Sequence, residues 1–117
     1  MTDLVSKKCV PHEKMVKLSN KEIKDYLSQV NGWEFLPARQ SLGAGGETHK
    51  IVKEFKFKDF KEAMEFVNKI AEIAEKEGHH PDIFIHYNKV EITLWSHFIN
   101  GLSENDFIIA AKIDNFI

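Results

Sequence analysis

The spacing of apolar positions predicts two amphipathic helices in the first part of the chain. Ser19 and Glu22 form a capping box, in which each side chain satisfies a backbone N–H of the other residue, and Gly32 is expected to end this helix as a left-handed cap. Its apolar stripe consists of Ile23, Tyr26, Leu27 and Val30. A longer stripe begins after Asp59 and ends before Gly78, which is placed to stop the second helix. Its members are Phe60, Ala63, Met64, Val67, Ile70, Ala71 and Ala74, widened by Phe66 and Ile73.

Four other segments have the features of β-strands. Residues 33–36 form a short apolar segment, and residues 48–57 alternate between apolar and polar positions. The buried face of this second strand is expected to hold Ile51, Phe55 and Phe57. Residues 82–87 and 90–95 also alternate, and Asn88-Lys89 between them is a candidate two-residue hairpin turn.

The remaining segments complete the expected order of elements. A third helix is predicted from Ser103, with Asp106 as its capping partner. Its inward side chains are expected to be Phe107, Ala110, Ala111 and Ile117. Residues 41–47 form a glycine-rich turn that lacks the G-K-[ST] ending of a phosphate loop. Residues 1–17 have no periodicity and are predicted to be a flexible N-terminal arm, whereas residues 18–117 form a single domain.

The predicted order is therefore α-β-β-α-β-β-α. Helices placed on one face of an antiparallel four-stranded sheet make an α+β fold, a two-layer sandwich. The expected core is modest because a chain of 117 residues buries a smaller share of its surface than a large domain does.

Composition narrows the classes of function. The net charge of −2 gives no general attraction to nucleic acid or to an anionic membrane. A single cysteine, Cys9, excludes an internal disulfide, and Cys9 and His12 at C-x-x-H spacing lack the second cysteine that a zinc set would need. The chain has no apolar segment long enough for a signal peptide or a membrane span, so a cytoplasmic location is expected.

The predicted hairpin register determines which histidines lie opposite each other. If Tyr87 pairs with Val90, the core face pairs Ile85 with Ile92 and Ile83 with Leu94. On the opposite face, the same register places His86 opposite Glu91, as an expected ion pair, and His80 opposite His97. His80 and His97 are thus expected to share a small pocket near Trp95, whereas the direction of His79 stays open.

Three interpretations of His80 and His97 compete. They could form a structural hydrogen-bonded pair, or, with His79, bind zinc in an open catalytic site. They could also perform acid–base chemistry, because an imidazole titrates near pH ~6.5 and can give or take a proton at neutral pH. The residues alone leave all three interpretations open.

A resemblance to a known family favours one of these three interpretations. The segment E-x-x-G-H-H-P-D-I-F-I-x-Y-N-K-V-x-I-T-L, followed by S-H and G-L-S-E-x-D, resembles the pterin-4a-carbinolamine dehydratases. The resemblance extends to the G-W at 32–33 and to F-K-F-K-D-F-K-E-A at 55–63, and it covers residues 18–114. It implies an α+β sandwich that dehydrates 4a-hydroxytetrahydropterin (4a-hydroxytetrahydrobiopterin in its natural form) to quinonoid dihydropterin. This reaction recycles the pterin cofactor of aromatic amino acid hydroxylases.

The resemblance also assigns residues. The family's catalytic histidines correspond to His79, His80 and His97. The substrate contacts that it implies are Gly78, His79, His80, Pro81, Trp95, Ser96, His97 and Phe98, together with the helix-end Glu75 and Trp33 near the pocket. Trp95, Phe98 and Asn105 differ from residues common in the family, which leaves the preferred pterin side chain open.

The resemblance implies a homodimer or homotetramer that needs no metal and no other cofactor. His80 and His97 are expected to transfer the protons, and His79 to hold the pterin or aid departure of its hydroxyl group. The alternative is a non-catalytic dimerisation or transcriptional cofactor module, since mammalian members also bind a homeodomain transcription factor.

Overall fold

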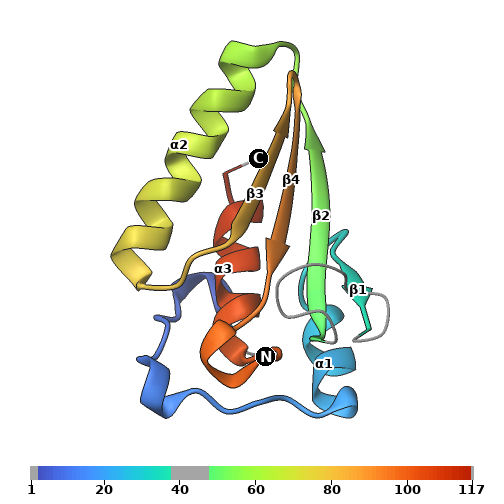
Figure 1. Ribbon diagram of the computed structural model, residues 1–117, viewed down its shortest axis with the longest axis vertical. Helices are drawn as coiled ribbons and strands as arrows, with labels where there is room; N and C mark the ends of the chain where they lie inside the picture. Colours follow the sequence, from blue (N-terminus) through green and yellow to red (C-terminus); the bar gives the residue numbers. More distant parts are fainter. Residues whose placement is uncertain (1–2, 38–47, 117) are drawn as a thin grey trace.

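Four antiparallel strands and three helices form two layers in the computed structural model, which describes residues 3–37 and 48–116 (Figure 1). The strand order in the sheet is β1-β2-β4-β3. The strands are β1 Glu34–Leu36, β2 Lys50–Lys56, β3 Asp82–His86 and β4 Lys89–Leu94. The helices are α1 Asn20–Leu27, α2 Phe60–Glu77 and α3 Glu104–Asp114, with short 3-10 turns η1 Leu4–Ser6, η2 His12–Lys14 and η4 His97–Ile99. The predicted fold class and the order of elements are confirmed.

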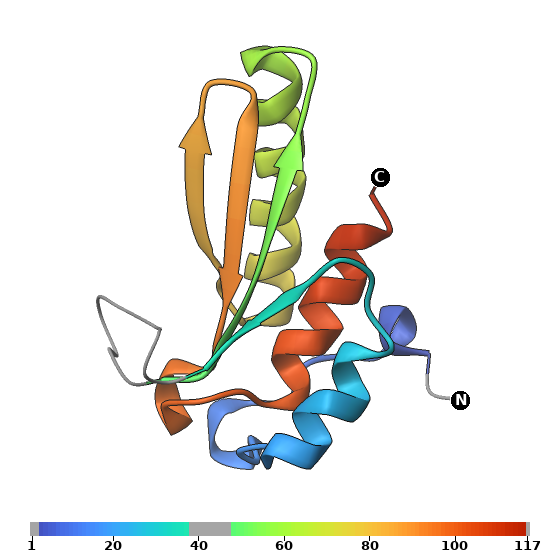
Figure 2. The same cartoon turned by 90° about the vertical axis from the view of Figure 1, so that its right-hand side faces the viewer.

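The helices lie on one side of the sheet, with α2 running along the strands and α3 beside it (Figure 2). No helix within the described ranges is long and apolar enough to cross a membrane. Two predictions concern residues outside the described ranges, the glycine-rich turn at 41–47 and the inward direction of Ile117.

The first helix begins as predicted but ends earlier. Both hydrogen bonds of the Ser19–Glu22 capping box are present, at 2.9 and 3.2 Å. Gly32 has a positive φ of 80°, yet α1 already ends at Leu27, so the prediction that Gly32 caps it is wrong. The Ser28 hydroxyl donates to the backbone carbonyl of Asp25 at 2.6 Å, and this local bond competes with continued helix.

The second helix has the predicted limits but a rotated buried face. The Asp59 carboxylate accepts the backbone N–H of Glu62 at 2.9 Å, and Gly78 ends the helix with a φ of 69°. Its fully buried side chains are Ala63, Phe66, Ile70 and Ala74. Phe60 and Ala71 are exposed, contrary to the predicted stripe. The cause is Phe66, whose ring packs 4.8 Å from the rings of both Phe55 and Phe57 and turns this face towards β2.

The hairpin register differs from the prediction by two residues. Ile83 pairs with Ile92 and Ile85 with Val90, so the turn residues are Tyr87 and Asn88. The Asn88 carbonyl accepts the N–H of Phe57 at 2.8 Å, and its amide donates to the Phe57 carbonyl at 3.0 Å. These two bonds hold the turn against the end of β2. The register of the hairpin is therefore set partly by a residue outside it.

The shift of two residues preserves the faces of the strands but changes their partners. Val90, Ile92 and Leu94 are fully buried, as predicted. Two side chains expected on the core face are exposed, Tyr87 at 65% because it lies in the turn and Ile85 at 36% on the edge strand β3. His86 faces Lys89, and its ring packs edge-on against Phe84 at 4.3 Å. The predicted ion pair between His86 and Glu91 is therefore wrong.

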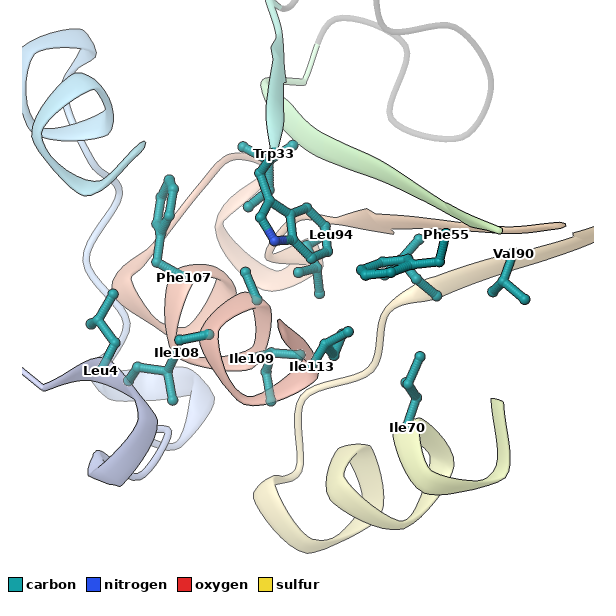
Figure 3. Close-up of a cluster of buried hydrophobic side chains, with 14 of the residues drawn as sticks. Leu4, Trp33, Phe55, Ile70, Val90, Leu94, Phe107, Ile108, Ile109 and Ile113 are labelled. Carbon is teal, nitrogen blue, oxygen red and sulfur yellow. The ribbon is translucent and has the colours of Figure 1, made fainter. Parts of the chain in front are cut away.

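The core lies between the sheet and α3, and this helix is buried on most sides (Figure 3). Phe107, Ala110 and Ala111 are buried as expected, and so are Ile108 and Ile109 on the other side of the helix. The capping box of Ser103 and Asp106 is confirmed. The N-terminal arm also reaches this core, because Leu4 in η1 is only 4% exposed. Residues 3–17 thus lie against the domain, while their predicted flexibility stays a prediction.

Candidate active site

The end of α2 places two adjacent histidines in different environments. The N–H groups of Gly78 and His79 both donate to the carbonyl of Ala74, at 2.9 and 3.2 Å, so the chain turns sharply at the left-handed glycine. His79 is then 5% exposed. The side chain of His80 is 59% exposed. The predicted ambiguity in the direction of His79 is thus resolved by a turn that buries it.

His79 is held by a buried carboxylate. Its Nε2 lies 2.6 Å from Oδ1 of Asp106, which is completely buried. Oδ2 of Asp106 accepts the hydroxyl of Ser96 at 2.8 Å and the backbone N–H of Ser103 at 3.0 Å. The hydroxyls of Ser96 and Ser103 are themselves 2.7 Å apart. Each oxygen of this buried acid therefore has a partner, as buried polar groups require.

These contacts define the tautomer of His79. An ionised carboxylate only accepts hydrogen bonds, so with Asp106 as the acceptor Nε2–H of His79 is the donor. In this tautomer of neutral His79, Nδ1 carries no proton and is an acceptor. Carboxylates that orient an imidazole in this manner fix its ring and stabilise its protonated form.

His80 has a more exposed version of the same arrangement. Its Nε2 lies 2.6 Å from Oε2 of Glu75, one turn earlier on α2, whose side chain is 79% exposed. Because solvent screens both groups, this pair orients the ring but adds little stability.

His97 comes from the turn that follows β4. The backbones of Ser96 and Gly101 exchange two hydrogen bonds, at 2.7 and 3.3 Å, and this bridge closes η4. The ring of His97 packs 3.9 Å from the ring of Trp95. Trp95 is buried, and its indole N–H donates to Asp82 at 3.0 Å. The rigid indole therefore supports an otherwise exposed imidazole.

His79, His80 and His97 line one cavity of about 130 Å³, together with a fourth histidine, His12. Its walls are His12, Met15, Gly78, His79, His80, Trp95, His97 and Phe98. Figure 1 shows the segments that supply them, the end of α2, the turn after β4 and the N-terminal arm, at the lower end of the molecule. His80 and His97 do not meet through strand pairing, since the ladder ends at the pair of Asp82 with Thr93. The expected opposition of these two histidines in a continued ladder is wrong, and they reach the cavity from two loops instead.

Other residues assigned by resemblance lie outside the cavity walls. Ser96 is buried behind His79 in the Asp106 network, and Glu75 contacts the cavity through His80. Pro81 follows the histidine pair without joining the walls. Trp33 lies in the core, where its indole N–H donates to Asp114 at 3.1 Å (Figure 3). The structure therefore does not bring Trp33 to the histidines.

A larger hollow of about 720 Å³ lies between β2, α2 and the end of α3. Its walls combine phenylalanine rings with Lys and Glu side chains and contain no histidine. Convergent acid–base groups distinguish an active site better than volume does, so the smaller cavity is the candidate.

The zinc hypothesis finds no ligand set. Among the residues that the structure describes, no three His, Cys, Asp or Glu side chains are arranged to hold a metal ion. The thiol of Cys9 donates to the carbonyl of Asn105 at 3.8 Å, whereas the ring of His12 stacks on Phe98 at 5.6 Å. The C-x-x-H pair thus has two separate sets of partners.

Comparison with known proteins assigns a family to this geometry. The family model described as pterin 4 alpha carbinolamine dehydratase matches residues 16–116. The chain belongs to this family. A relative in Alkaliphilus metalliredigens that carries the family's name is 46% identical over 116 residues, which cover 97% of this chain and 96% of the relative. The Arabidopsis thaliana protein named pterin-4-alpha-carbinolamine dehydratase 2, mitochondrial, is 38% identical, over 97% of this chain and 59% of that protein.

Two solved structures have the same fold. The transcriptional coactivator/pterin dehydratase of Brucella melitensis has a TM-score of 0.74 and 35% identity, covering 86% of this chain and 97% of that one. A pterin dehydratase-like protein described as a RuBisCO assembly factor in the alpha-carboxysome has a TM-score of 0.56 and 24% identity, over 73% and 88% of the two chains. This second likeness concerns the fold alone.

Three residues of the site were not predicted from the sequence. Asp106 was interpreted only as a helix cap, and no local pattern indicated that its carboxylate lies inside the protein. His12 and Met15 belong to the arm, and no periodic pattern there indicated that they reach the cavity.

Proposed function

We propose that this protein is a hydro-lyase that converts a 4a-hydroxytetrahydropterin into the quinonoid dihydropterin and water. The observation that carries the proposal is the convergence of His79, His80 and His97 on one cavity, which His12 also lines, in a chain of this family. One of the three is held by a buried aspartate and two are open to solvent.

The reaction requires an acid and a base but no electron acceptor. The C4a–O bond breaks, and the hydroxyl takes a proton to leave as water. N5 loses its hydrogen, and the electron pair of that bond forms the C4a=N5 double bond. Imidazoles suit both transfers near neutral pH, and each positioned group contributes a rate factor of about 10²–10⁴.

The environments of the histidines support different roles. His80 and His97 are exposed and can exchange protons with water between turnovers, so we assign the two proton transfers to them. His79 is buried and fixed by Asp106, which suits a residue that holds the pterin or assists the departing hydroxyl. Glu75 orients His80, and Trp95 and Phe98 supply apolar wall against the flat pterin ring.

The assay is the decay of 4a-carbinolamine, followed by absorbance and compared with the spontaneous rate. His80→Ala and His97→Ala are each expected to lower kcat by about 10²–10⁴-fold. His86→Ala is the matched control, because His86 lies at the hairpin turn away from the cavity. Full activity in His80→Ala would refute the assigned roles.

In this proposal the protein recycles the pterin of an aromatic amino acid hydroxylase, in the cytoplasm and as a homodimer or homotetramer. The competing function is a non-catalytic dimerisation or transcriptional cofactor module. The description of the Brucella melitensis protein as a transcriptional coactivator/pterin dehydratase supports this alternative. Calorimetry separates the two, since a module of that kind would bind no dihydropterin and would copurify with a stable protein partner.

A further inference from the structure

The N-terminal arm is anchored beside the cavity by specific contacts. The buried side chain of Asn105 accepts the N–H of Val10 and donates to its carbonyl, both at 2.9 Å. The N–H of Cys9 donates to Glu77 at 2.8 Å. Because an unsatisfied buried amide costs about 1–3 kcal/mol, Asn105 favours the docked position of the arm.

The anchored arm contributes two walls of the cavity. The sulfur of Met15 lies 3.6 Å from the hydroxyl oxygen of Ser103, so the arm contacts the network around Asp106. His12 follows the anchored Val10 after one proline, and its ring stacks on Phe98 at 5.6 Å with an angle of 25° between the planes. Phe98 is 65% exposed, so the stacked rings of His12 and Phe98 form the outer edge of the cavity.

A second hollow begins on the other side of His12. It measures about 450 Å³ and shares His12 and Gly78 with the histidine cavity. The arm supplies most of its remaining wall, from Cys9 to Glu13. Ligand pockets commonly measure ~300–1,000 Å³, so the histidine cavity alone, at about 130 Å³, is too small for a pterin with its side chain.

From this juxtaposition we propose that His12 is a specificity-determining residue that contacts the substituent at C6 of the pterin. The inference rests on the proposed function. The reacting ring occupies the histidine cavity, and the C6 substituent passes His12 into the second hollow. His12 has ring nitrogens that can bond a hydroxylated substituent and a face that packs against its carbons. The arm thereby makes the protein prefer pterins with a polar C6 chain of several carbons over pterins with a single methyl group.

The test compares two carbinolamines, one with a dihydroxypropyl group at C6 and one with a methyl group. His12→Ala is expected to lower kcat/KM for the dihydroxypropyl substrate about tenfold, mainly through KM, which corresponds to about 1.4 kcal/mol. The value for the methyl substrate should change less than about twofold. His86→Ala, the matched control, should leave both values unchanged. An equal loss for both substrates, or no loss for either, would overturn the proposal.

A binding measurement keeps this inference separate from the proposed function. The dissociation constants of the two corresponding 7,8-dihydropterins are measured by calorimetry for wild type and His12→Ala. If wild type binds both pterins without dehydrating either carbinolamine, the proposed function fails, and the change in the ratio of the two constants alone decides the role of His12. If wild type binds neither, both proposals are overturned.

Discussion

Asp106→Asn tests how the buried aspartate controls His79. The substitution keeps the shape of the side chain but replaces one acceptor oxygen with an amide donor. Oδ2 of Asp106 must accept from Ser96 and Ser103, so the retained oxygen is expected there, and the new NH₂ faces Nε2 of His79. Nε2 then becomes an acceptor, and the ring proton moves to Nδ1. The variant therefore presents a donor where wild type presents an acceptor.

The structure sets the size of the effect. Three donors lose a charged acceptor in a site without solvent access, and hydrogen bonds to charged groups contribute about 1.5–3 kcal/mol each, against about 0.5–1.5 for neutral ones. The free energy of unfolding should fall by about 2–4 kcal/mol, which a domain with about 5–15 kcal/mol tolerates. Loss of the correct tautomer should lower kcat by about 10²–10⁴-fold.

Urea unfolding and carbinolamine decay measure the two effects on the same preparation. The pH dependence of kcat and the ¹⁵N chemical shifts of His79 report the tautomer itself. Asp114→Asn is the matched control, because Asp114 accepts from Trp33 and Lys53 far from the cavity and should lower stability without changing kcat. An Asp106→Asn variant with wild-type kcat and an unchanged pH profile would refute the role assigned to this carboxylate.

Three other substitutions or reactions test the surroundings of the site. Gly78→Ala should lower the free energy of unfolding by about 1–2 kcal/mol in urea titrations, because φ is 69° and no atom lies within 4 Å of the added Cβ, so backbone strain is the only cost. A loss near zero would contradict this. Burial, followed by the charge of Glu77, raises the pKa of Cys9 from 9.0 to about 12, so alkylation at pH 8 should be about 10²–10³-fold slower in the folded than in the urea-unfolded protein. Equal rates would show that the thiol is accessible. The hydrogen bond from Lys7 lowers the pKa of Glu104. This interaction therefore stabilises the folded protein above the pKa that Glu104 has in the unfolded chain, and the stabilisation is lost as the pH falls through the lower pKa of the folded state. Lys7→Met should therefore cost less than about 1 kcal/mol at pH 7, and the difference from wild type should shrink below pH 4 in parallel urea titrations. A difference that persists at low pH would exclude this cause.

The parts of the fold that could be predicted depend on neighbours in the sequence. A capping box needs residues three apart, and the left-handed stop at Gly78 needs only a residue without a Cβ. The inward side chains of β4, Val90, Ile92 and Leu94, were also predicted correctly, because an error of two residues in register preserves the alternation of a strand. The register itself depends on Phe57, which follows β2 and bonds the turn from outside the hairpin, and local patterns contain no information about that contact.

The same distinction applies to the candidate site. His79 and His80 are adjacent, and the motif around them identified both before any geometry was known. Asp106 approaches His79 only because α3 packs behind the end of α2. His12 approaches the cavity only because Asn105 anchors the arm. Both are tertiary contacts between segments far apart in the chain, and the local pattern of each segment predicts only its own secondary structure.

The adjacent histidines also show how one turn of backbone separates two chemical environments. A helix that continued past Glu77 would keep both rings on its own cylinder, about 100° apart around the axis. The left-handed Gly78 ends the helix instead, so His79 enters the protein beside Asp106 while His80 stays outside beside Glu75. The proposed water elimination would use this difference, because a fixed ring can hold the substrate while an exposed ring renews its proton from solvent. The glycine that ends α2 thus separates the environments of the two imidazoles, and the roles proposed for them depend on this separation.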